Sequence, residues 1–321
     1  MRALVTGIEG FVGHYLAAHL LDSGRQVVGT MHPGAPVPGW AENLHVELYR
    51  CNVEDRSSLA SVLESTRPTE IYHLAGVSHV PQSWEDPGST FRTNVGGAIN
   101  LLDAVRAVAP QSRVLVVSSS DVYGTSGSSR PWCEDDRPAP ASPYAVSKLT
   151  AEHLAHAYHL RYKLGVACVR PTNHIGPGQA ARFVIPSFAR RIALVEAGRE
   201  PPVLRVGNLG VFRDFTDVRD VVRAYRMVMD LSRPWGCFNV CRGKPLLLGD
   251  VLATLLLASS VPVRVEVDPA LVRPGEAEVL ELDPTRLREA TGWEPSIPLE
   301  VTLRDVLAHW RRIVAEEVEP T

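Results

Sequence analysis

A tyrosine and a lysine in one short segment are the first candidates for chemistry. Tyr144 and Lys148 stand four residues apart, directly after Ser142 and Pro143, a pair that is typical of a helix start. On a helix, the two side chains lie one turn apart on the same face. A lysine ammonium beside a phenol lowers the pKa of the phenol from about 10 towards neutral pH, which makes the phenol a usable proton donor or acceptor. The same spacing also occurs by chance on ordinary exposed helices.

A serine-rich strand end is the second candidate. The run from Val114 to Val117 predicts a strand, and Ser118, Ser119, Ser120 and Asp121 follow it. Open α/β sheets bind their ligands at the carboxyl ends of the strands. A serine hydroxyl at this position can therefore share a substrate oxygen with the phenol.

Three glycines near the N-terminus are the third candidate. Gly7, Gly10 and Gly13 are spaced by three residues between a predicted strand and a predicted helix. In such a loop the first glycine permits a tight turn, the second lets backbone N–H groups approach a pyrophosphate, and the third lets the helix pack closely on the strand. Alone, the spacing also fits a plain strand-to-helix turn. Together, the three features indicate hydride transfer at a carbon that bears oxygen.

The end of the second predicted strand bears on the choice of cofactor. Folds that prefer NAD usually carry an acidic residue there, which holds the 2′-hydroxyl of the adenosine ribose. In this chain, Thr30, Met31 and His32 occupy the position, with no carboxylate. A phosphorylated ribose is thus not repelled, and Thr30 and His32 can hydrogen-bond it, although no arginine stands there to bind it firmly. We expect NADP(H) to be favoured and NAD(H) to be possible.

The elements that must position these residues alternate between short β-branched runs and longer amphipathic segments. The predicted strands cover residues 3–5, 26–29, 70–73, 113–117 and 166–169, and the predicted helices cover residues 12–21, 57–65, 90–109 and 144–162. This alternation predicts an α/β fold with a doubly wound parallel sheet of the Rossmann type.

The pattern changes after Arg170, where prolines and glycines break the chain into loops and short helices. A helix over 218–231 and a strand over 237–240 can still rejoin the first sheet. We therefore predict a smaller, interleaved C-terminal substrate domain. The dinucleotide-binding domain is expected to comprise residues 1–171 with about 213–241 and 285–310, and the nucleotide-sugar-binding domain residues 172–212 and 242–284.

Composition excludes several classes of protein. The 321 residues are 45 % hydrophobic and 21 % charged, which excludes a disordered chain, collagen and a coiled coil. A net charge of −3 provides no basic field for nucleic acid or anionic lipid, so a small-molecule partner is expected. The longest apolar run, Val251 to Val263, is too short to cross a bilayer and predicts a buried helix.

The cysteines and the N-terminus indicate a cellular compartment. Five cysteines contain no CxxC pair, and they are interpreted as reduced core thiols that hold no metal: Cys51, Cys133, Cys168, Cys237 and Cys241. The chain reaches its glycine loop before any apolar stretch could serve as a signal peptide. We therefore expect a cytoplasmic protein with no membrane partner.

The order of the glycine loop, the serine-ended strand and the Tyr144–Lys148 pair resembles the extended short-chain dehydrogenase/reductase family, whose members act mostly on nucleotide-sugars. The resemblance covers essentially the whole chain. It implies that Tyr144 is the acid/base, that Lys148 anchors the nicotinamide ribose and tunes Tyr144, and that Ser119 hydrogen-bonds the reacting oxygen. It also implies cofactor contacts from the glycine loop and three later segments: Gly7, Gly10, Phe11, Val12, Gly13, Asn52, Val53, Leu74, Ala75, Gly76 and Asn94.

Residues 170–179 resemble the segment of that family that closes over nicotinamide and sugar, and residues 206–218 and 271–276 resemble its GDP-sugar branch in particular. The resemblance implies that Asn173 contacts pyrophosphate or sugar, that Arg213 and Arg273 bind the diphosphate, and that Glu276 accepts hydrogen bonds from ribose or guanine. Ser78 is a further candidate for the sugar. The alternative interpretation of residues 170–179 is a proline- and glycine-rich surface loop. The alternative for Arg213 and Arg273 is that each forms only a surface ion pair with a nearby acidic residue, which stabilises the fold little.

Asp121 separates two activities that share these segments. In the family, the GDP-mannose 4,6-dehydratases carry a glutamate at the position matched by Asp121, for proton removal at C5. Aspartate withdraws the carboxylate by about 1.5 Å, which should harm a proton transfer that depends on geometry. A reductase needs only hydride delivery to C4 and a proton from the tyrosine.

The resemblance therefore implies an NAD(P)H-dependent reductase that converts GDP-4-keto-6-deoxy-D-mannose, a GDP-linked hexose, to GDP-D-rhamnose. The alternatives are a GDP-mannose 4,6-dehydratase, a nucleotide-sugar C4 epimerase and a non-catalytic NADP-binding regulator. A homodimer through the helices over 90–109 and 144–162 is also expected, because paired helices could form a four-helix bundle.

Overall fold

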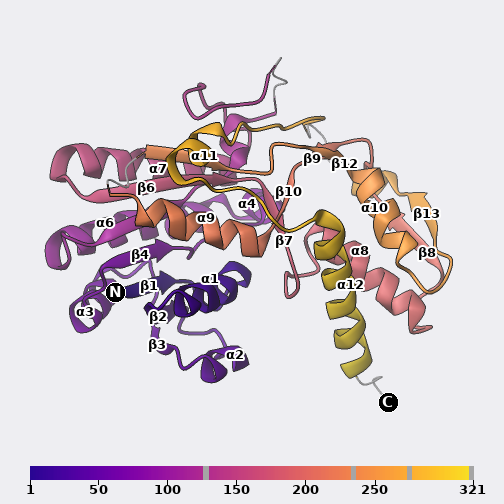
Figure 1. The fold of residues 1–321 in the computed structure, drawn as a ribbon, viewed down its shortest axis with the longest axis horizontal. Coiled ribbons are helices and arrows are strands. Elements are labelled where there is room, and N and C mark those ends of the chain that lie inside the picture. Colours follow the sequence, from indigo (N-terminus) through magenta and orange to yellow (C-terminus); the bar gives the residue numbers. More distant parts are fainter. Residues whose placement is uncertain (126–129, 233–235, 273–276, 318–321) are drawn as a thin grey trace.

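A computed structural model describes residues 1–125, 130–232, 236–272 and 277–317. Its centre is a seven-stranded sheet in the order β11-β6-β5-β4-β1-β2-β3, in which every neighbouring pair is parallel. Figure 1 shows the sheet between two layers of helices. The strands are β1 (Arg2–Thr6), β2 (Gln26–Met31), β3 (Glu47–Arg50), β4 (Glu70–His73), β5 (Arg113–Val117), β6 (Gly165–Pro171) and β11 (Gly236–Val240). The predicted doubly wound α/β fold is confirmed.

The inner strands are apolar on both faces because helices cover both. In β1, Ala3 and Val5 belong to the cluster on one face, whereas Leu4 belongs to the cluster on the other. Side chains alternate between the faces of a strand, so a continuous apolar run supplies both clusters. The first face is covered by α1 (Phe11–Asp22), α9 (Val218–Asp230) and α11 (Thr285–Thr291), and the second by α3 (Arg56–Thr66), α6 (Gly97–Val108) and α7 (Pro143–Tyr162).

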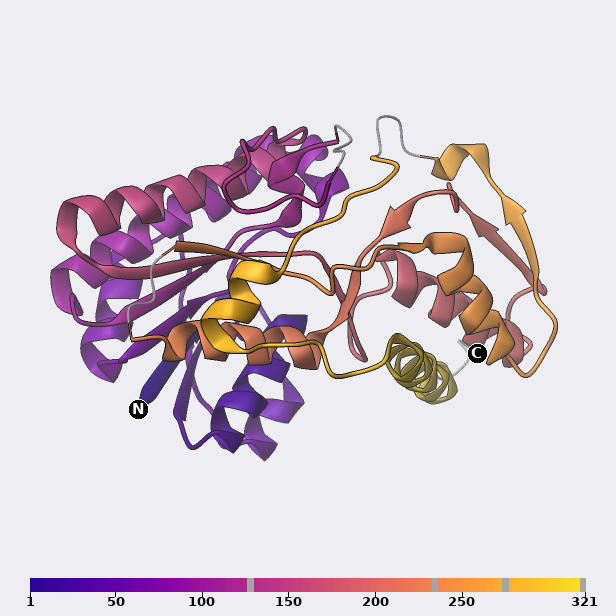
Figure 2. The ribbon, with the colours of Figure 1, turned by 45° about the horizontal axis from the view of Figure 1, so that its top comes forward.

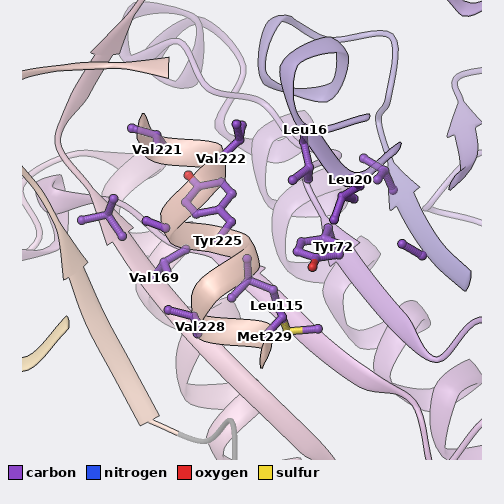
Figure 3. Close-up of a cluster of buried hydrophobic side chains, with 14 of the residues drawn as sticks. Leu16, Leu20, Tyr72, Leu115, Val169, Val221, Val222, Tyr225, Val228 and Met229 are labelled. Atoms are coloured by element: carbon purple, nitrogen blue, oxygen red, sulfur yellow. The ribbon is translucent and has the colours of Figure 1, made fainter. Parts of the chain in front are cut away.

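The cluster under α9 connects the late part of the chain to the early sheet. Figure 3 shows Tyr225 and Val228 of α9 in one cluster with Leu115 of β5, Val169 of β6 and Leu16 of α1. All five side chains are buried. The return of the chain to the sheet as α9 and β11 therefore completes one core from segments that are far apart in sequence.

The helix that carries the Tyr–Lys pair begins where the sequence predicts. Ser142 caps α7 by accepting a hydrogen bond from the backbone N–H of Ala145, and Pro143 occupies the first turn. Lys163 ends the helix in the left-handed conformation. These local signals fix the register that places Tyr144 and Lys148 on one face.

Two predicted helices differ from the structure, and one strand was not predicted. The edge strand β3 was not expected, because its Glu47–Arg50 run holds one aliphatic residue and is half exposed. The expected helix over 90–109 is divided into α5 (Pro87–Phe91), a π-helical turn η1 (Arg92–Gly96) and α6. The expected buried helix over 251–263 is α10 (Leu248–Leu257), which ends at the 88 % exposed Leu257.

A second lobe lies beside the sheet, as Figure 2 shows. It consists of α8 (Val184–Glu196), β8 (Val203–Val206), α10, β13 (Arg264–Val267) and α12 (Leu299–Glu316), which share a separate hydrophobic cluster. β8 and β13 form a parallel pair, and α12 packs against α8 and α10. Because α12 packs in this lobe, the expectation that residues 299–310 belong to the dinucleotide-binding domain is wrong, whereas Leu287 of α11 does pack on the sheet. The other limits of the two predicted domains stay a prediction.

Short elements connect the sheet to the second lobe. The pairs β7 (Asn173–Ile175) with β10 (Phe215–Asp217) and β9 (Phe212–Arg213) with β12 (Leu246–Leu247) lie between them. The remaining short elements are α2 (Gly39–Asn43) after β2, α4 (Val80–Glu85) after β4, the 3₁₀ turn η2 (Ser120–Tyr123) after β5 and the 3₁₀ turn η3 (Pro269–Leu271) after β13. These connections place residues 172–217 next to the carboxyl ends of the strands.

Candidate active site

One large cavity runs from the glycine loop to the second lobe. Its volume is about 1960 Å³, and its walls include residues of the loop, of the strand ends and of the second lobe. Pockets for one drug-sized ligand measure about 300–1,000 Å³, so this cavity has room for two ligands side by side. Its position at the carboxyl ends of the strands is where open α/β sheets bind their ligands.

The glycine loop is shaped for a close approach of backbone to ligand. Gly7 has a φ of 67°, a left-handed conformation, and a methyl group there would lie 2.7 Å from the Cα of Ala75. A methyl group on Gly13 would lie 2.2 Å from the carbonyl oxygen of Ile8. The N–H groups of the first turn of α1, which begins at Phe11, have no partner within the helix and sit at its positive end. This cradle fits the pyrophosphate of a dinucleotide.

The three predicted catalytic residues meet in the cavity. Ser119, Tyr144 and Lys148 all line its wall. The Ser119 hydroxyl accepts a hydrogen bond of 3.2 Å from the backbone N–H of Asp121 and is also hydrogen-bonded to the Tyr144 hydroxyl. The Lys148 ammonium donates to the carbonyl oxygen of Val117 over 2.9 Å. A substrate oxygen at this point would therefore meet a phenol and a serine hydroxyl together.

The proton affinities of this set differ from the prediction. Burial, aided by the negative charge of Asp121, raises the pKa of Tyr144 well above its usual range, and the hydrogen bond from Ser119 opposes the rise only in part. Lys148 lies 6.0 Å from the centre of the Tyr144 ring, and burial lowers its own pKa to about 8. The expectation that Lys148 lowers the pKa of Tyr144 is wrong for this structure, because desolvation outweighs the distant ammonium. Tyr144 is thus held as a neutral proton donor.

Asp121 faces both the phenol and an arginine of the connecting strands. It lines the cavity beside Ser119, and burial raises its pKa, whereas the Arg213 guanidinium acts to lower it. The carboxyl group and the phenol each disfavour ionisation of the other, as the raised pKa of Tyr144 shows. Asp121 therefore influences the proton affinity of Tyr144, although the two residues come from different segments of the chain.

Asn94 supports the cavity from behind rather than lining it. Its side chain accepts from the backbone N–H of Val77 over 2.8 Å and donates to the carbonyl of Val77 and to the Ser147 hydroxyl. A methyl group on Gly76 would lie 2.8 Å from the Asn94 amide oxygen. Leu74, Ala75 and Gly76 do line the cavity, as predicted. Asn94, which lies in the π-helical turn η1, thus holds the segment from Leu74 to Val77 through its side-chain hydrogen bonds.

Thr6 and His73 form a contact that sequence reasoning missed. The Thr6 hydroxyl lies 2.8 Å from Nδ1 of His73 and accepts from the backbone N–H of Ala75. Burial, with a contribution from Lys148, lowers the pKa of His73 to about 3, so the imidazole is neutral at pH 7. This contact ties the ends of β1 and β4 beneath the glycine loop. A polar residue at the end of each strand was the available signal.

At the adenosine end of the cavity, one predicted contact is corrected. His32, Asn52 and Val53 line the cavity, but Thr30 does not, because its side chain is fully buried within the sheet. Thr30 therefore cannot reach a ribose phosphate from this position. Glu9, which sequence reasoning passed over, does line this end. It could have been found as the one acidic residue inside the glycine loop.

At the sugar end, the structure places some of the predicted contacts and leaves others undescribed. Ser78, Asn173 and Arg213 line the cavity. Arg213 donates to the carbonyl oxygens of Phe212 and Ala277, at 2.7 and 2.9 Å. Arg273 and Glu276 lie outside the described residues.

The carboxylates that could have paired with Arg213 have other partners. Asp217 accepts from Arg219 over 2.7 Å, and Asp214 accepts backbone N–H groups of residues 242–244. The alternative of a surface ion pair between Arg213 and either aspartate is therefore wrong. Three further arginines line the second lobe's side of the cavity and were missed, because each lies on a different element: Arg182, Arg191 and Arg205.

Several other features bear on the wider expectations. All five cysteines are free, with Cys51, Cys168 and Cys241 buried and Cys133 and Cys237 partly buried. Among the described residues, no group of three histidine, cysteine or acidic side chains could hold a metal ion. No helix within the described ranges combines the length and the hydropathy that a membrane crossing needs.

Comparison with known proteins gives consistent relatives. A family model described as GDP-mannose 4,6 dehydratase matches residues 4–306. The chain is 36 % identical to a GDP-6-deoxy-D-mannose reductase of Pseudomonas aeruginosa, over 98 % of this chain and 99 % of the relative. It is 29 % identical to a GDP-mannose 4,6-dehydratase of Yersinia enterocolitica, over 96 % of this chain and 93 % of the relative.

Solved structures show the same fold. The structure of RMD from Pseudomonas aeruginosa complexed with NADPH superposes with a TM-score of 0.86 at 35 % identity, covering 97 % of this chain and 99 % of that chain. A UDP-glucose 4-epimerase from Thermus thermophilus in complex with NAD gives a TM-score of 0.85 at 29 % identity, covering 97 % and 99 %. The chain is thus similar to proteins that bind either dinucleotide.

Proposed function

The chain belongs to the GDP-mannose 4,6-dehydratase family of extended short-chain dehydrogenases/reductases, and on that premise we propose that it reduces GDP-4-keto-6-deoxy-D-mannose at C4 to GDP-D-rhamnose. The observation that carries this proposal is that Ser119, Tyr144 and Lys148 line one cavity together with the glycine loop. The phenol of Tyr144, whose pKa burial raises, is available there as a proton donor. A carbonyl that accepts hydride needs such a proton donor.

The side chains divide the work at the C4 oxygen. When bound, the reduced nicotinamide supplies the hydride. Tyr144 donates its proton to the oxygen as negative charge develops there, and the Ser119 hydroxyl hydrogen-bonds the same oxygen. The ammonium of Lys148, held by the Val117 carbonyl, places a positive charge nearby and offers donors to a ribose hydroxyl.

The cofactor we propose is NADP(H), with NAD(H) as a possible second. The glycine cradle serves either, since both share the pyrophosphate. The NADPH complex of the Pseudomonas aeruginosa relative supports NADP(H), and the NAD complex of the Thermus thermophilus epimerase supports the alternative. Gly7, Gly10, Phe11, Val12 and Gly13 would hold the pyrophosphate, and Asn52 and Val53 the adenine.

The GDP moiety is proposed to extend towards the second lobe. Arg213 supplies a guanidinium that can bind two phosphate oxygens at once. Ser78 and Asn173 line the same cavity and are proposed to contact the sugar. By resemblance, Arg273 and Glu276 would add a diphosphate and a nucleoside contact.

Dehydration of GDP-mannose is the second candidate function. The buried Asp121, with its raised pKa beside Tyr144, provides a carboxyl group at the position where the dehydratases of the family carry a glutamate. Aspartate is one methylene shorter, and proton transfer at C5 depends on distance. The reductase is therefore preferred.

Absorbance of the reduced nicotinamide distinguishes the two. Purified protein is mixed with NADPH and GDP-4-keto-6-deoxymannose, and in parallel with GDP-mannose. The reductase consumes NADPH with the keto sugar alone, and NMR of the product identifies GDP-D-rhamnose. Conversion of GDP-mannose to a keto sugar without net NADPH loss would establish the dehydratase instead.

We also propose a cytoplasmic homodimer that binds neither nucleic acid nor membrane. The segments over 90–109 and 144–162, which hold α6 and α7, carry exposed aromatic or apolar side chains, namely Phe91 at 36 %, Leu160 at 56 % and Tyr162 at 45 % exposure. Two copies of these helices could pair as a four-helix bundle. Sedimentation equilibrium at assay concentration tests this, and a monomer would contradict it.

A further inference from the structure

Two cysteines lie on neighbouring strands, away from the candidate active site. Cys168 of β6 and Cys237 of β11 are paired in the parallel register of the two strands. Both side chains belong to the apolar cluster on the α7 face of the sheet, Cys168 as a buried member and Cys237 as a partly buried neighbour. Both thiols are free, and neither lines the large cavity. The proposed reduction of the keto sugar therefore uses neither cysteine.

A second, smaller cavity borders this pair. Its volume is about 240 Å³, and its wall combines two thiols with three imidazoles and a carboxylate, namely those of Cys168, Cys237, His153, His156, His159 and Glu152. His153 and His156 are exposed on α7. Cys168 is only 5 % exposed, whereas Cys237 is half-buried. A reagent from solvent therefore meets the Cys237 thiol first.

The spacing of the two strands suits a bond between the two sulfurs. Neighbouring strands run about 4.7–4.9 Å apart, and disulfides form over Cα separations of about 4.4–6.8 Å. Both side chains lie on the same face of the sheet, as their shared cluster shows. β11 is the edge strand of the described sheet and pairs there with β6 alone. It can therefore adjust its position without disturbing a second neighbouring strand.

We propose that Cys168 and Cys237 form an oxidisable dithiol, a modification site whose reagent is a low-molecular-weight disulfide such as oxidised glutathione. The Cys237 thiol loses its proton to water or to a neighbouring imidazole, and the thiolate attacks one sulfur of the reagent. A mixed disulfide forms and one glutathione thiolate leaves. Cys168 then loses its proton, attacks the Cys237 sulfur and expels the second glutathione thiolate. Two protein thiols are thus oxidised to one disulfide, while the reagent is reduced to two thiols.

The new bond would close the stretch of chain between the two cysteines. This stretch contains β7, α8, β8 and α9, the whole path from the sheet to the second lobe and back. Closing a long loop restricts the unfolded chain, so the oxidised protein should unfold at a temperature higher by roughly 5 °C. The inference goes beyond the proposed function and does not depend on it.

Burial controls the rate of this exchange. It raises the pKa of both thiols well above the usual range, and the negative charge of Glu152 acts in the same direction, whereas Arg170 opposes the rise. Only the thiolate attacks a disulfide. The rate of disulfide formation should therefore increase about tenfold for each pH unit above neutrality, without a plateau near the pKa of an ordinary cysteine.

The test incubates the whole chain with oxidised glutathione, blocks the remaining thiols with N-ethylmaleimide and measures the intact mass and the peptide map. We expect a loss of two hydrogens per chain and one peptide pair joined through Cys168 and Cys237. Cys168→Ala should stop at the mixed disulfide on Cys237, because the second thiol is missing. Cys237→Ala should leave the buried Cys168 unmodified. Cys133→Ser, which changes a partly buried cysteine outside the smaller cavity, should form the disulfide as the wild type does.

Each outcome decides the inference. A wild-type protein that keeps both thiols free at alkaline pH would overturn it, as would one that stops at the mixed disulfide or joins Cys237 to a different cysteine. If Cys168→Ala does not fold, as judged by its thermal transition, the wild-type peptide map and the pH dependence carry the same decision. Mass and peptide maps do not depend on turnover of the keto sugar. Failure of the reductase assay and failure of this inference are therefore separate results.

Discussion

The glycine-loop edge of the sheet and the second lobe build the two halves of the cavity by different means. At the edge, backbone does the work: Gly7 and Gly13 approach Ala75 and Ile8 so closely that no side chain fits between them. Around the second lobe, arginine side chains from short, separate elements line the wall. The comparison indicates that the backbone of the glycine-loop edge selects a dinucleotide as the ligand. The side chains around the second lobe would select among nucleotide-sugars.

Electrostatics sharpens the contrast. The edge offers a helix N-terminus and the carboxylates of Glu9 and Glu54, while the lobe offers guanidinium groups such as that of Arg213. Diphosphate groups of both ligands need positive partners, and each half supplies them in its own way. The proposed catalytic residues line the cavity between these two halves, so changes there should have the largest effects.

Tyr144→Phe tests the proposed proton donor, which lies between the two halves of the cavity. Removal of the proton donor should lower turnover of the keto sugar by about 10²–10⁴-fold, the usual worth of general acid catalysis. GDP-sugar and cofactor affinities should stay within threefold, because the ring remains. NADPH consumption measures the turnover, and calorimetry measures the two affinities. Tyr158→Phe, whose hydroxyl donates to Asp103 on α6, is the matched control and should retain its rate. A Tyr144→Phe protein with near wild-type turnover would eliminate the assignment.

Gly13→Ala tests the backbone-built edge. The added methyl group would lie 2.2 Å from the Ile8 carbonyl, so the loop must shift. We expect a loss of about 1–3 kcal/mol in the free energy of unfolding and weaker binding of both dinucleotides, measured by urea titration and calorimetry. Gly39→Ala meets no atom within 4 Å and should change neither quantity appreciably. If Gly13→Ala and Gly39→Ala had the same unfolding free energy and the same dinucleotide affinity, the close backbone contact at Gly13 would not be what builds this half of the cavity.

Arg213→Met tests the side-chain-built half. A charge-assisted contact contributes about 1.5–3 kcal/mol, so its loss should weaken GDP binding by roughly ten- to a hundredfold. The affinity for the cofactor should not change. Calorimetric titration with GDP and with NADPH separates the two. Arg264→Met removes the same charge from an exposed pair with Glu266 on β13 and serves as the control. A parallel loss of cofactor affinity in Arg213→Met would show that the halves are not independent.

The pH profile tests the charge of Lys148, and no effect of it is expected below about pH 8. Lys148 is charged below its pKa of about 8 and neutral above it, so its stabilisation of the developing negative charge is lost as pH rises. We expect kcat/KM to fall by about tenfold per pH unit above that value if the charge is essential. Tyr144 stays protonated over this range and does not cause the fall. Lys148→Arg, which stays charged, should lack this descending limb, and a flat wild-type profile from pH 6 to 10 would contradict the role.

Local signals explain what could be predicted from the sequence. The cap and proline of α7 fix the Tyr144–Lys148 face, and the glycine spacing indicates the phosphate cradle, because both depend on residues a few positions apart. The edge strand β3 was missed because its pattern is half exposed and polar. Thr30 was misplaced as a cofactor ligand because strand pairing, which buries its side chain, is not a local property.

By itself, the sequence determined the fold class and indicated the candidate catalytic set of Ser119, Tyr144 and Lys148. Apolar periodicity, caps and glycines act over one or two turns of chain, so they can be read without knowing what lies opposite. Only the tertiary structure decided the proton affinity of Tyr144, since burial and Asp121 set it, and the position of Glu9 at the end of β2. Desolvation and charge contacts depend on segments brought together from distant parts of the chain, and no local pattern contains them.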